Sequence, residues 1–253
     1  MLRGSVRSQP FELDLVYTSV RKWGNRMMMD KHDRYPHGYR FSRVEQRSWP
    51  QLHLVAGPPY SLTHVRNVCR QVYPFVDRIH LRLKAGTSEQ GMEWACRLLE
   101  TGAARPEQLV INGMPEVARY FGAGLHLPEA APLPAGRLRV TEGRDRVAVG
   151  VSVHSPDTAE AKEVLGADYL YFGHVYPSPS KPGLPPRGIE MLKETVARVS
   201  IPVIAIGGID DSRLEEVAES GCAGAAVISA LMEAADPGKA AWAMRQAMER
   251  YWT

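Results

Sequence analysis

Two adjacent glycines near the end of the chain give the clearest indication of a ligand. Gly207 and Gly208 follow the apolar run Ile204-Ala205-Ile206, and a later stretch of small residues ends in Ile228 and Ser229. Glycine lets the backbone approach a ligand closely, and a helix that begins after such a turn directs its free N–H groups toward an anion. We therefore predict that these four residues hold a phosphate group. A tight turn that simply requires glycine is the alternative.

A histidine and a proline-rich segment follow the run Tyr171-Phe172-Gly173. Because the usual pKa of histidine is about 6.5, His174 is suited to donate and accept protons at neutral pH, and we predict it as the catalytic residue. Prolines stiffen the segment after it, and we expect Ser178, Ser180 and Lys181 to close over an anionic ligand. A solvated loop with a structural histidine is the alternative.

Cations lie at the end of an apolar segment nearer the N-terminus, His80-Leu81-Arg82-Leu83-Lys84. Alternation along a strand places His80, Arg82 and Lys84 on one face. Buried cations are costly unless they are paired, so we predict that Arg82 and Lys84 bind a carboxylate or a phosphate.

Other polar residues end further apolar segments. Asn112 precedes a glycine and is either part of a turn or a hydrogen-bonding partner of a heterocycle, and Ser152 is expected to face the ligand. His154 is predicted to support the site through a hydrogen bond, and Ser155 to cap a helix. Glu129 has no carboxylate companion near Asn112, so we predict no Mg²⁺ site between these two segments.

All these residues fall where short apolar runs end, and the runs alternate with amphipathic stretches typical of repeated βα units. The predicted strands are Leu52–Val55, Arg78–Leu83, Leu109–Asn112, Gly124–Leu127, Val147–Ser152, Asp168–Phe172, Pro202–Ile206 and Gly224–Ile228. Helices are predicted between most of them, among others Ser88–Glu100, Pro156–Leu165, Asp211–Glu219 and Pro237–Tyr251. Residues 51–253 are therefore expected to form a catalytic α/β domain, a (β/α)8 TIM barrel, whose ligands bind where the strands end. An open doubly wound sheet is the alternative.

Composition and charge divide the chain into two unlike parts. The 253 residues include 44% hydrophobic and 23% charged residues, as in ordinary globular proteins, and three widely spaced cysteines that predict neither a disulfide framework nor zinc. Residues 1–50 contain ten Lys or Arg and five Asp or Glu, a net +5, which leaves 3 − 5 = −2 for the remainder. We expect residues 1–50 to be a poorly ordered basic extension or a start-site artefact; a tail for a partner or a clamp on the barrel are alternatives. The acidic remainder argues against nucleic-acid binding. No apolar run is long enough to cross a membrane, and a cytoplasmic location is expected.

Several of these motifs, in this order, resemble the thiamine phosphate synthase superfamily. The resemblance covers about residues 52–252 and includes Gly124-Leu125-His126-Leu127-Pro128, Phe172-Gly173-His174-Val175, Ser180-Lys181 and the run from Pro202 to Ile209. Synthases of this superfamily characteristically carry Asn-Asp-Arg after strand three, an aspartate after strand four, and a proline where this chain has His174. This chain has Asn112-Gly113-Met114 and an alanine near residue 130 instead. By these differences it resembles the thiazole tautomerase (TenI-type) branch.

The resemblance implies an activity and leaves two alternatives. A tautomerase would be a cofactor-free isomerase that aromatises a carboxylated thiazole phosphate, with His174 moving the proton and Arg82 or Lys84 holding the carboxylate. The first alternative is a thiamine phosphate synthase, which joins hydroxymethylpyrimidine pyrophosphate to thiazole phosphate. The second is a regulator that binds thiazole phosphate without turnover. Barrels of this superfamily commonly pair, so a homodimer is expected.

Overall fold

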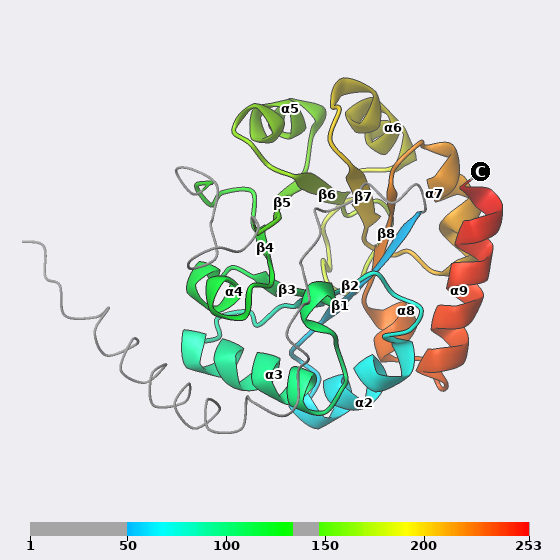
Figure 1. Cartoon of the computed structure of the whole chain (residues 1–253). Helices are drawn as coiled ribbons and strands as arrows, with labels where there is room; N and C mark the ends of the chain where they lie inside the picture. The colour runs from blue at the N-terminus through cyan, green and yellow to red at the C-terminus, as the bar shows by residue number, and fades with distance from the viewer. Residues whose placement is uncertain (1–49, 134–146, 253) are drawn as a thin grey trace, which may run out of the picture.

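The protein is described by a computed structural model that covers residues 50–133 and 147–252. Parallel strands close into a barrel in the order β1-β2-β3-β4-β5-β6-β7-β8. The ring closes because β8 pairs with β1, which places Leu52 beside Ala225. Figure 1 shows the helices surrounding the strands. The predicted (β/α)8 barrel is therefore confirmed, and an open sheet is excluded.

The elements follow the sequence pattern closely. The strands are β1 (Gln51–Ala56), β2 (Arg78–Leu81), β3 (Leu109–Asn112), β4 (Gly124–Leu127), β5 (Val149–Val153), β6 (Tyr169–Gly173), β7 (Val203–Ile206) and β8 (Gly224–Val227). The helices are α2 (Leu62–Val72), α3 (Ser88–Glu100), α4 (Pro115–Phe121), α5 (Pro156–Val164), α6 (Ile189–Arg198), α7 (Leu214–Glu219), α8 (Ser229–Met232) and α9 (Pro237–Tyr251), with short 3₁₀ turns η1 (Pro106–Gln108) and η2 (Asp211–Arg213). One boundary corrects the prediction in a way that matters for the site. Strand β2 ends at Leu81, so Arg82 and Lys84 lie in the segment after it.

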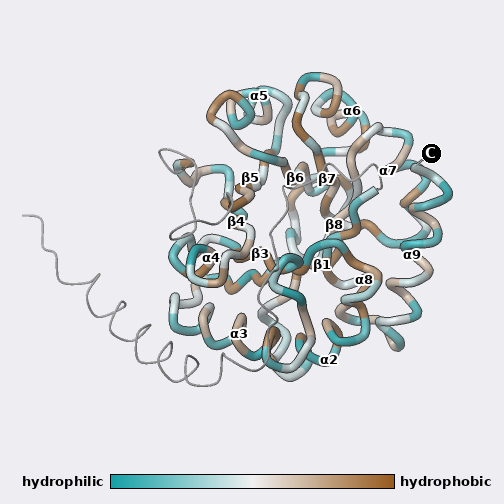
Figure 2. The backbone as a smooth tube through the Cα atoms, in the orientation of Figure 1, coloured by the Kyte–Doolittle hydropathy of each residue, from teal (hydrophilic) through white to brown (hydrophobic). Residues whose placement is uncertain are grey.

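Side chains on the two faces of the strands pack into different cores. Leu52, Leu54 and their counterparts on other strands point outward and pack beneath the helices. The opposite face points into the barrel, where Val55, Tyr171, Ile204 and Ala226 form a small apolar cluster. Figure 2 shows hydrophobic backbone positions concentrated in the strands, with hydrophilic positions on the outer turns of the helices. The barrel interior is therefore a packed layer of side chains, as this fold requires.

Local sequence determines where several helices begin. The hydroxyl oxygen of Thr87 accepts a hydrogen bond from the backbone N–H of Gln90, and the side-chain oxygen of Gln90 accepts one from the backbone N–H of Thr87. Ser155 caps α5 through the N–H of Thr158, as predicted. These caps satisfy N–H groups that the first helical turn leaves free.

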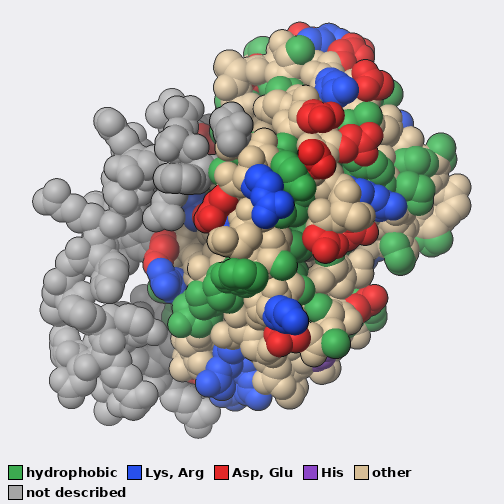
Figure 3. Space-filling view, turned by 90° about the vertical axis from the view of Figure 1, so that its right-hand side faces the viewer, with side chains coloured by type: hydrophobic (Ala, Val, Ile, Leu, Met, Phe, Trp, Pro, Cys, Tyr) green, Lys and Arg blue, Asp and Glu red, His purple; other side chains and the backbone are tan. Residues whose placement is uncertain are grey.

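Some expectations concern residues that the structure does not describe. The basic extension falls almost entirely within residues 1–49, and most of the link between β4 and β5 falls within residues 134–146. Among the described helices, none combines the length and hydropathy needed to span a bilayer. On the face drawn in Figure 3, cationic and anionic side chains are interspersed. The expected lack of nucleic-acid binding stays a prediction.

Candidate functional site

The glycine turn after β7 is held against the segment that follows β6. Gly207 and Gly208 have φ angles of 102° and 67°, in the region that favours glycine. A Cβ atom on Gly207 would lie 2.3 Å from Cβ of His174, and one on Gly208 would lie 2.4 Å from the carbonyl oxygen of Pro177. Both glycines are therefore required by close packing as well as by backbone conformation. Ile228 and Ser229 lie at the neighbouring exit, where β8 leads into α8.

An arginine that the sequence pattern did not single out supports this turn. The guanidinium of Arg213 donates to the carbonyl oxygen of Gly208 and lies 4.7 Å from the ring centroid of Tyr176. The hydroxyl of Tyr176 donates to Glu216 on α7 over 2.6 Å. Arg213 thus ties the glycine turn to the loop after β6. Its spacing from the glycines gave no signal in the sequence, because the contact depends on how the loops fold.

His174 is buried at the end of β6 and fixes the start of the following loop. Its Nε2 atom lies 3.2 Å from the carbonyl oxygen of Leu184, and its own carbonyl oxygen accepts the N–H of Arg187 over 2.8 Å. The ring therefore has a structural partner in the loop. Ser180 and Lys181, by contrast, are exposed on this loop.

The predicted residues on the other side of the barrel mouth are only partly brought together. Arg82 is half-buried just beyond β2, and burial lowers the pKa of its guanidinium. Lys84 is exposed further along the same segment. The side chains of Asn112 and Ser152 point inward and contact buried histidines, with Asn112 Oδ1 3.2 Å from Nδ1 of His80 and Ser152 Oγ 2.9 Å from Nε2 of His126.

The residues at the β3 and β4 exits do not fit a bound divalent cation. Such an ion prefers several carboxylate oxygens, yet Gly113 and Ala130 stand where the synthase pattern has acids. Glu129 is engaged by the backbone N–H of His154 over 3.1 Å. Within residues 50–133 and 147–252, no group of three His, Cys, Asp or Glu side chains is arranged to hold a metal.

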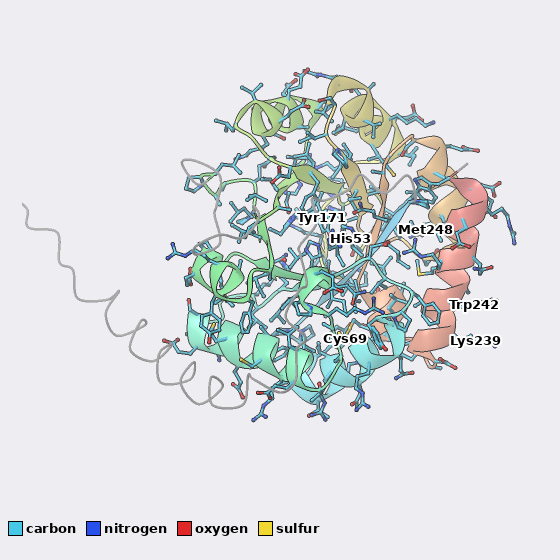
Figure 4. All side chains as sticks on the ribbon, viewed as in Figure 1. His53, Cys69, Tyr171, Lys239, Trp242 and Met248 are labelled. Carbon is cyan, nitrogen blue, oxygen red and sulfur yellow. The ribbon has the colours of Figure 1, made fainter. Side chains whose placement is uncertain are left out.

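A buried polar cluster inside the barrel is the main feature that the sequence pattern did not predict. His53, His80 and His126 are all buried, and their neighbours include Tyr169 and Tyr171. Figure 4 shows Tyr171 and His53 within the ring of strands, where the Tyr171 hydroxyl lies 2.7 Å from His53 Nδ1. The alternation along each strand predicts that these histidines and tyrosines face inward, but only the closed barrel shows that their side chains contact one another.

Burial sets the protonation of this cluster. Desolvation lowers the pKa of His53 and His80 well below the usual value, with the charge of Arg78 adding to the effect. Desolvation likewise lowers the pKa of His126 to about 3. The three histidines are therefore neutral at physiological pH.

The fold and these exits define a class, a closed TIM barrel with a glycine turn at the carboxyl-terminal end of β7, the end at which barrels of this kind bind their ligands. Residues 53–231 match the family described as thiamine monophosphate synthase, and the chain belongs to that family.

Curated relatives and solved structures agree with this assignment. A thiamine-phosphate synthase from Chlorobium limicola is 38% identical over 165 residues, which cover 64% of this chain and 78% of the relative. One from Gloeobacter violaceus is 35% identical over 195 residues, which cover 76% of this chain and 56% of the relative. A thiamine phosphate pyrophosphorylase structure from Pyrococcus furiosus has a TM-score of 0.63 at 26% identity and covers 82% of this chain and 99% of its own. A 3-hexulose-6-phosphate synthase, 20% identical with a TM-score of 0.60 over 78% and 99% of the two chains, shares the fold.

These comparisons overturn the predicted activity. The relatives that are 38% and 35% identical are named as synthases, and so are others at 33% and 37% identity. The prediction of a thiazole tautomerase, and with it of an isomerase, is therefore wrong. His174 and the missing acids differ from the synthase pattern at a few positions, whereas the similarity to the synthase family extends over residues 53–231.

Proposed function

We propose that this protein is a thiamine phosphate synthase, a transferase that joins hydroxymethylpyrimidine pyrophosphate to thiazole phosphate. The observation that carries the proposal is the match of residues 53–231 to the synthase family, and the glycine turn at the β7 exit supports it as a proposed phosphate site. Relatives with this printed activity are 33–38% identical to the chain.

In this reaction the thiazole nitrogen forms a bond to the exocyclic carbon of the pyrimidine. The bond from that carbon to the diphosphate oxygen breaks, and the diphosphate leaves with the electron pair. The protein has to align the two substrates and stabilise the charge of the leaving group. No proton transfer is required at the bond that forms, so His174 is assigned to holding the loop through Leu184.

The residues divide between the two substrates by position. Gly207, Gly208, Ile228 and Ser229 are proposed to hold the thiazole phosphate at the β7 and β8 exits. Arg82, Lys84 and Lys181 are proposed to meet the diphosphate, since they are the predicted cations around the mouth. Asn112 and Ser152 are proposed to hydrogen-bond a substrate from the opposite side, and Ser178 and Ser180 to contribute from the loop.

The experiment is product analysis with the purified full-length chain and both substrates. Thiamine phosphate and inorganic diphosphate should form in equal amounts, with neither produced when one substrate is omitted. The reaction is run with added Mg²⁺ and with a chelator, because the β3 and β4 exits lack the usual acids. Binding of both substrates without any product would refute the proposal.

A further inference from the structure

Two chains of hydrogen bonds run through the barrel interior and end at predicted substrate-binding residues. The first links Gln51, His53, Tyr171, His80 and Asn112, with His53 Nε2 2.9 Å from Gln51 and His80 Nε2 2.6 Å from the Tyr171 hydroxyl. It starts at the first residue of β1 and ends at the last residue of β3. It therefore connects the floor of the barrel to its mouth.

The number of hydrogens restricts the direction of this first chain. The amide oxygens of Gln51 and Asn112 face its two ends, so both outer imidazole nitrogens would have to donate. Neutral imidazole has one N–H, which would leave both inner nitrogens as acceptors for the single Tyr171 hydrogen. One inner nitrogen would then be unsatisfied. One of the two amides must therefore be turned, and all bonds of the chain must point the same way.

The charge of Arg78 decides between the two directions. Arg78 begins β2 beside His53 on β1, and its positive charge acts on both histidines of the chain. A positive charge attracts a lone pair and repels an N–H, so His53 should present the lone pair of Nε2 toward Gln51. The amide of Gln51 then donates to His53, and every later hydrogen points toward the mouth. His80 donates from Nδ1 to Asn112 Oδ1, which leaves the NH₂ group of Asn112 for a ligand.

The second chain of hydrogen bonds links Tyr169, His126 and Ser152, and it orients Ser152 as a donor toward a ligand. The hydroxyl of Tyr169 has one hydrogen-bond partner among the described residues, Nδ1 of His126 at 3.3 Å. A phenol hydrogen inside the barrel needs an acceptor, so Tyr169 donates to that nitrogen. Neutral His126 then carries its hydrogen on Nε2 and donates to Ser152 Oγ over 2.9 Å. The hydroxyl hydrogen of Ser152 is left for a ligand.

We propose that Tyr171 with His80, and Tyr169 with His126, are positioning residues that fix Asn112 and Ser152 as hydrogen-bond donors. The ligand group at this side of the mouth must then carry acceptors, such as a heterocyclic nitrogen or a phosphate oxygen. The proposal extends the proposed function by assigning a chemical preference to these two residues. The direction of the chains belongs to the protein itself and does not depend on which reaction follows.

The direct test is the tautomeric state of the histidines in the ligand-free protein. In ¹⁵N-histidine NMR spectra at pH 7.5, His53 and His80 should be protonated on Nδ1 and His126 on Nε2. These signals are assigned by through-bond experiments, so no variant has to fold. An Nε2–H form of His80, an Nδ1–H form of His126, or an imidazolium at either residue would overturn the proposal. This readout remains valid if synthase activity is absent.

Matched variants test the consequence for binding. Tyr171→Phe should give mixed tautomers at His80 and leave His126 unchanged, while Tyr169→Phe should do the reverse. Loss of one oriented donor should raise the KM of the substrate that Asn112 and Ser152 contact by about tenfold, with kcat changed by less than about threefold. Measuring KM separately for the two substrates identifies which one supplies the acceptor.

The control is Tyr73→Phe, which removes a tyrosine hydroxyl at the end of α2. It should change neither the tautomers nor either KM. Unchanged KM values in both interior variants, or equal rises in Tyr73→Phe, would refute the positioning role.

Discussion

Acid should destabilise the protein through its buried histidines, and His126 allows the size of the effect to be worked out. Burial lowers the pKa of His126 to about 3, whereas the unfolded chain has the ordinary value of 6.5. Between these values the unfolded state binds a proton that the folded state does not. Folding stability from this residue is therefore fully present above about pH 6.5 and is lost progressively as the pH falls toward 3.

The loss can be estimated at a pH where the comparison is practical. Each pH unit below the unfolded pKa costs about 1.4 kcal/mol per histidine, so His126 alone costs about 2 kcal/mol at pH 5. His53 and His80 act in the same direction, because burial also lowers their pKa values. Typical domains have a free energy of unfolding of about 5–15 kcal/mol. The combined loss from the three histidines should therefore be a large fraction of the total stability.

Urea unfolding at pH 7 and pH 5 measures this loss in the wild type and in His126→Gln. The variant should lose about 2 kcal/mol less than the wild type over this interval. Acidic groups contribute equally to both proteins and cancel in the comparison. His64→Gln is the matched control, since it removes an exposed histidine and should leave the wild-type loss in place. An equal loss in His126→Gln and the wild type would show that His126 is not a buried neutral group.

Packing and charge give three further predictions. In thermal unfolding, Gly208→Ala should destabilise the protein by about 3 kcal/mol, and it should also abolish phosphate binding. Gly102→Ala is the control: its φ is 65°, but an added Cβ would meet no atom within 4 Å, so it should cost only about 1–2 kcal/mol. Arg245→Ala should cost about 3–5 kcal/mol in urea unfolding because it removes the 2.5 Å ion pair with largely buried Asp77, while Arg97→Ala at an exposed pair should cost about 0.5 kcal/mol or less. Lys181→Ala should raise the KM for the diphosphate substrate about tenfold with little change in stability, and an unchanged KM would remove Lys181 from the site.

Much of the fold was determined by local pattern. Strands β3 and β4 and helices α3 and α9 have the predicted bounds, because alternation, helical periodicity and caps are properties of neighbouring residues. The glycine turn after β7 was likewise legible, since two adjacent glycines directly after a buried run favour a sharp turn with close backbone packing. The activity was misjudged because one residue, His174, was given more weight than the whole barrel.

Only the tertiary structure decided which side chains meet. Tyr171 joins His53 and His80 across the barrel because β8 closes onto β1. Tyr171 is separated from His53 by 118 positions in the chain and from His80 by 91, so no local pattern records these contacts. The protonation of the three histidines also depends on closure, since removal from water is what lowers their pKa values. Residue types and strand positions were fixed by the sequence, whereas burial and partnership arose from folding.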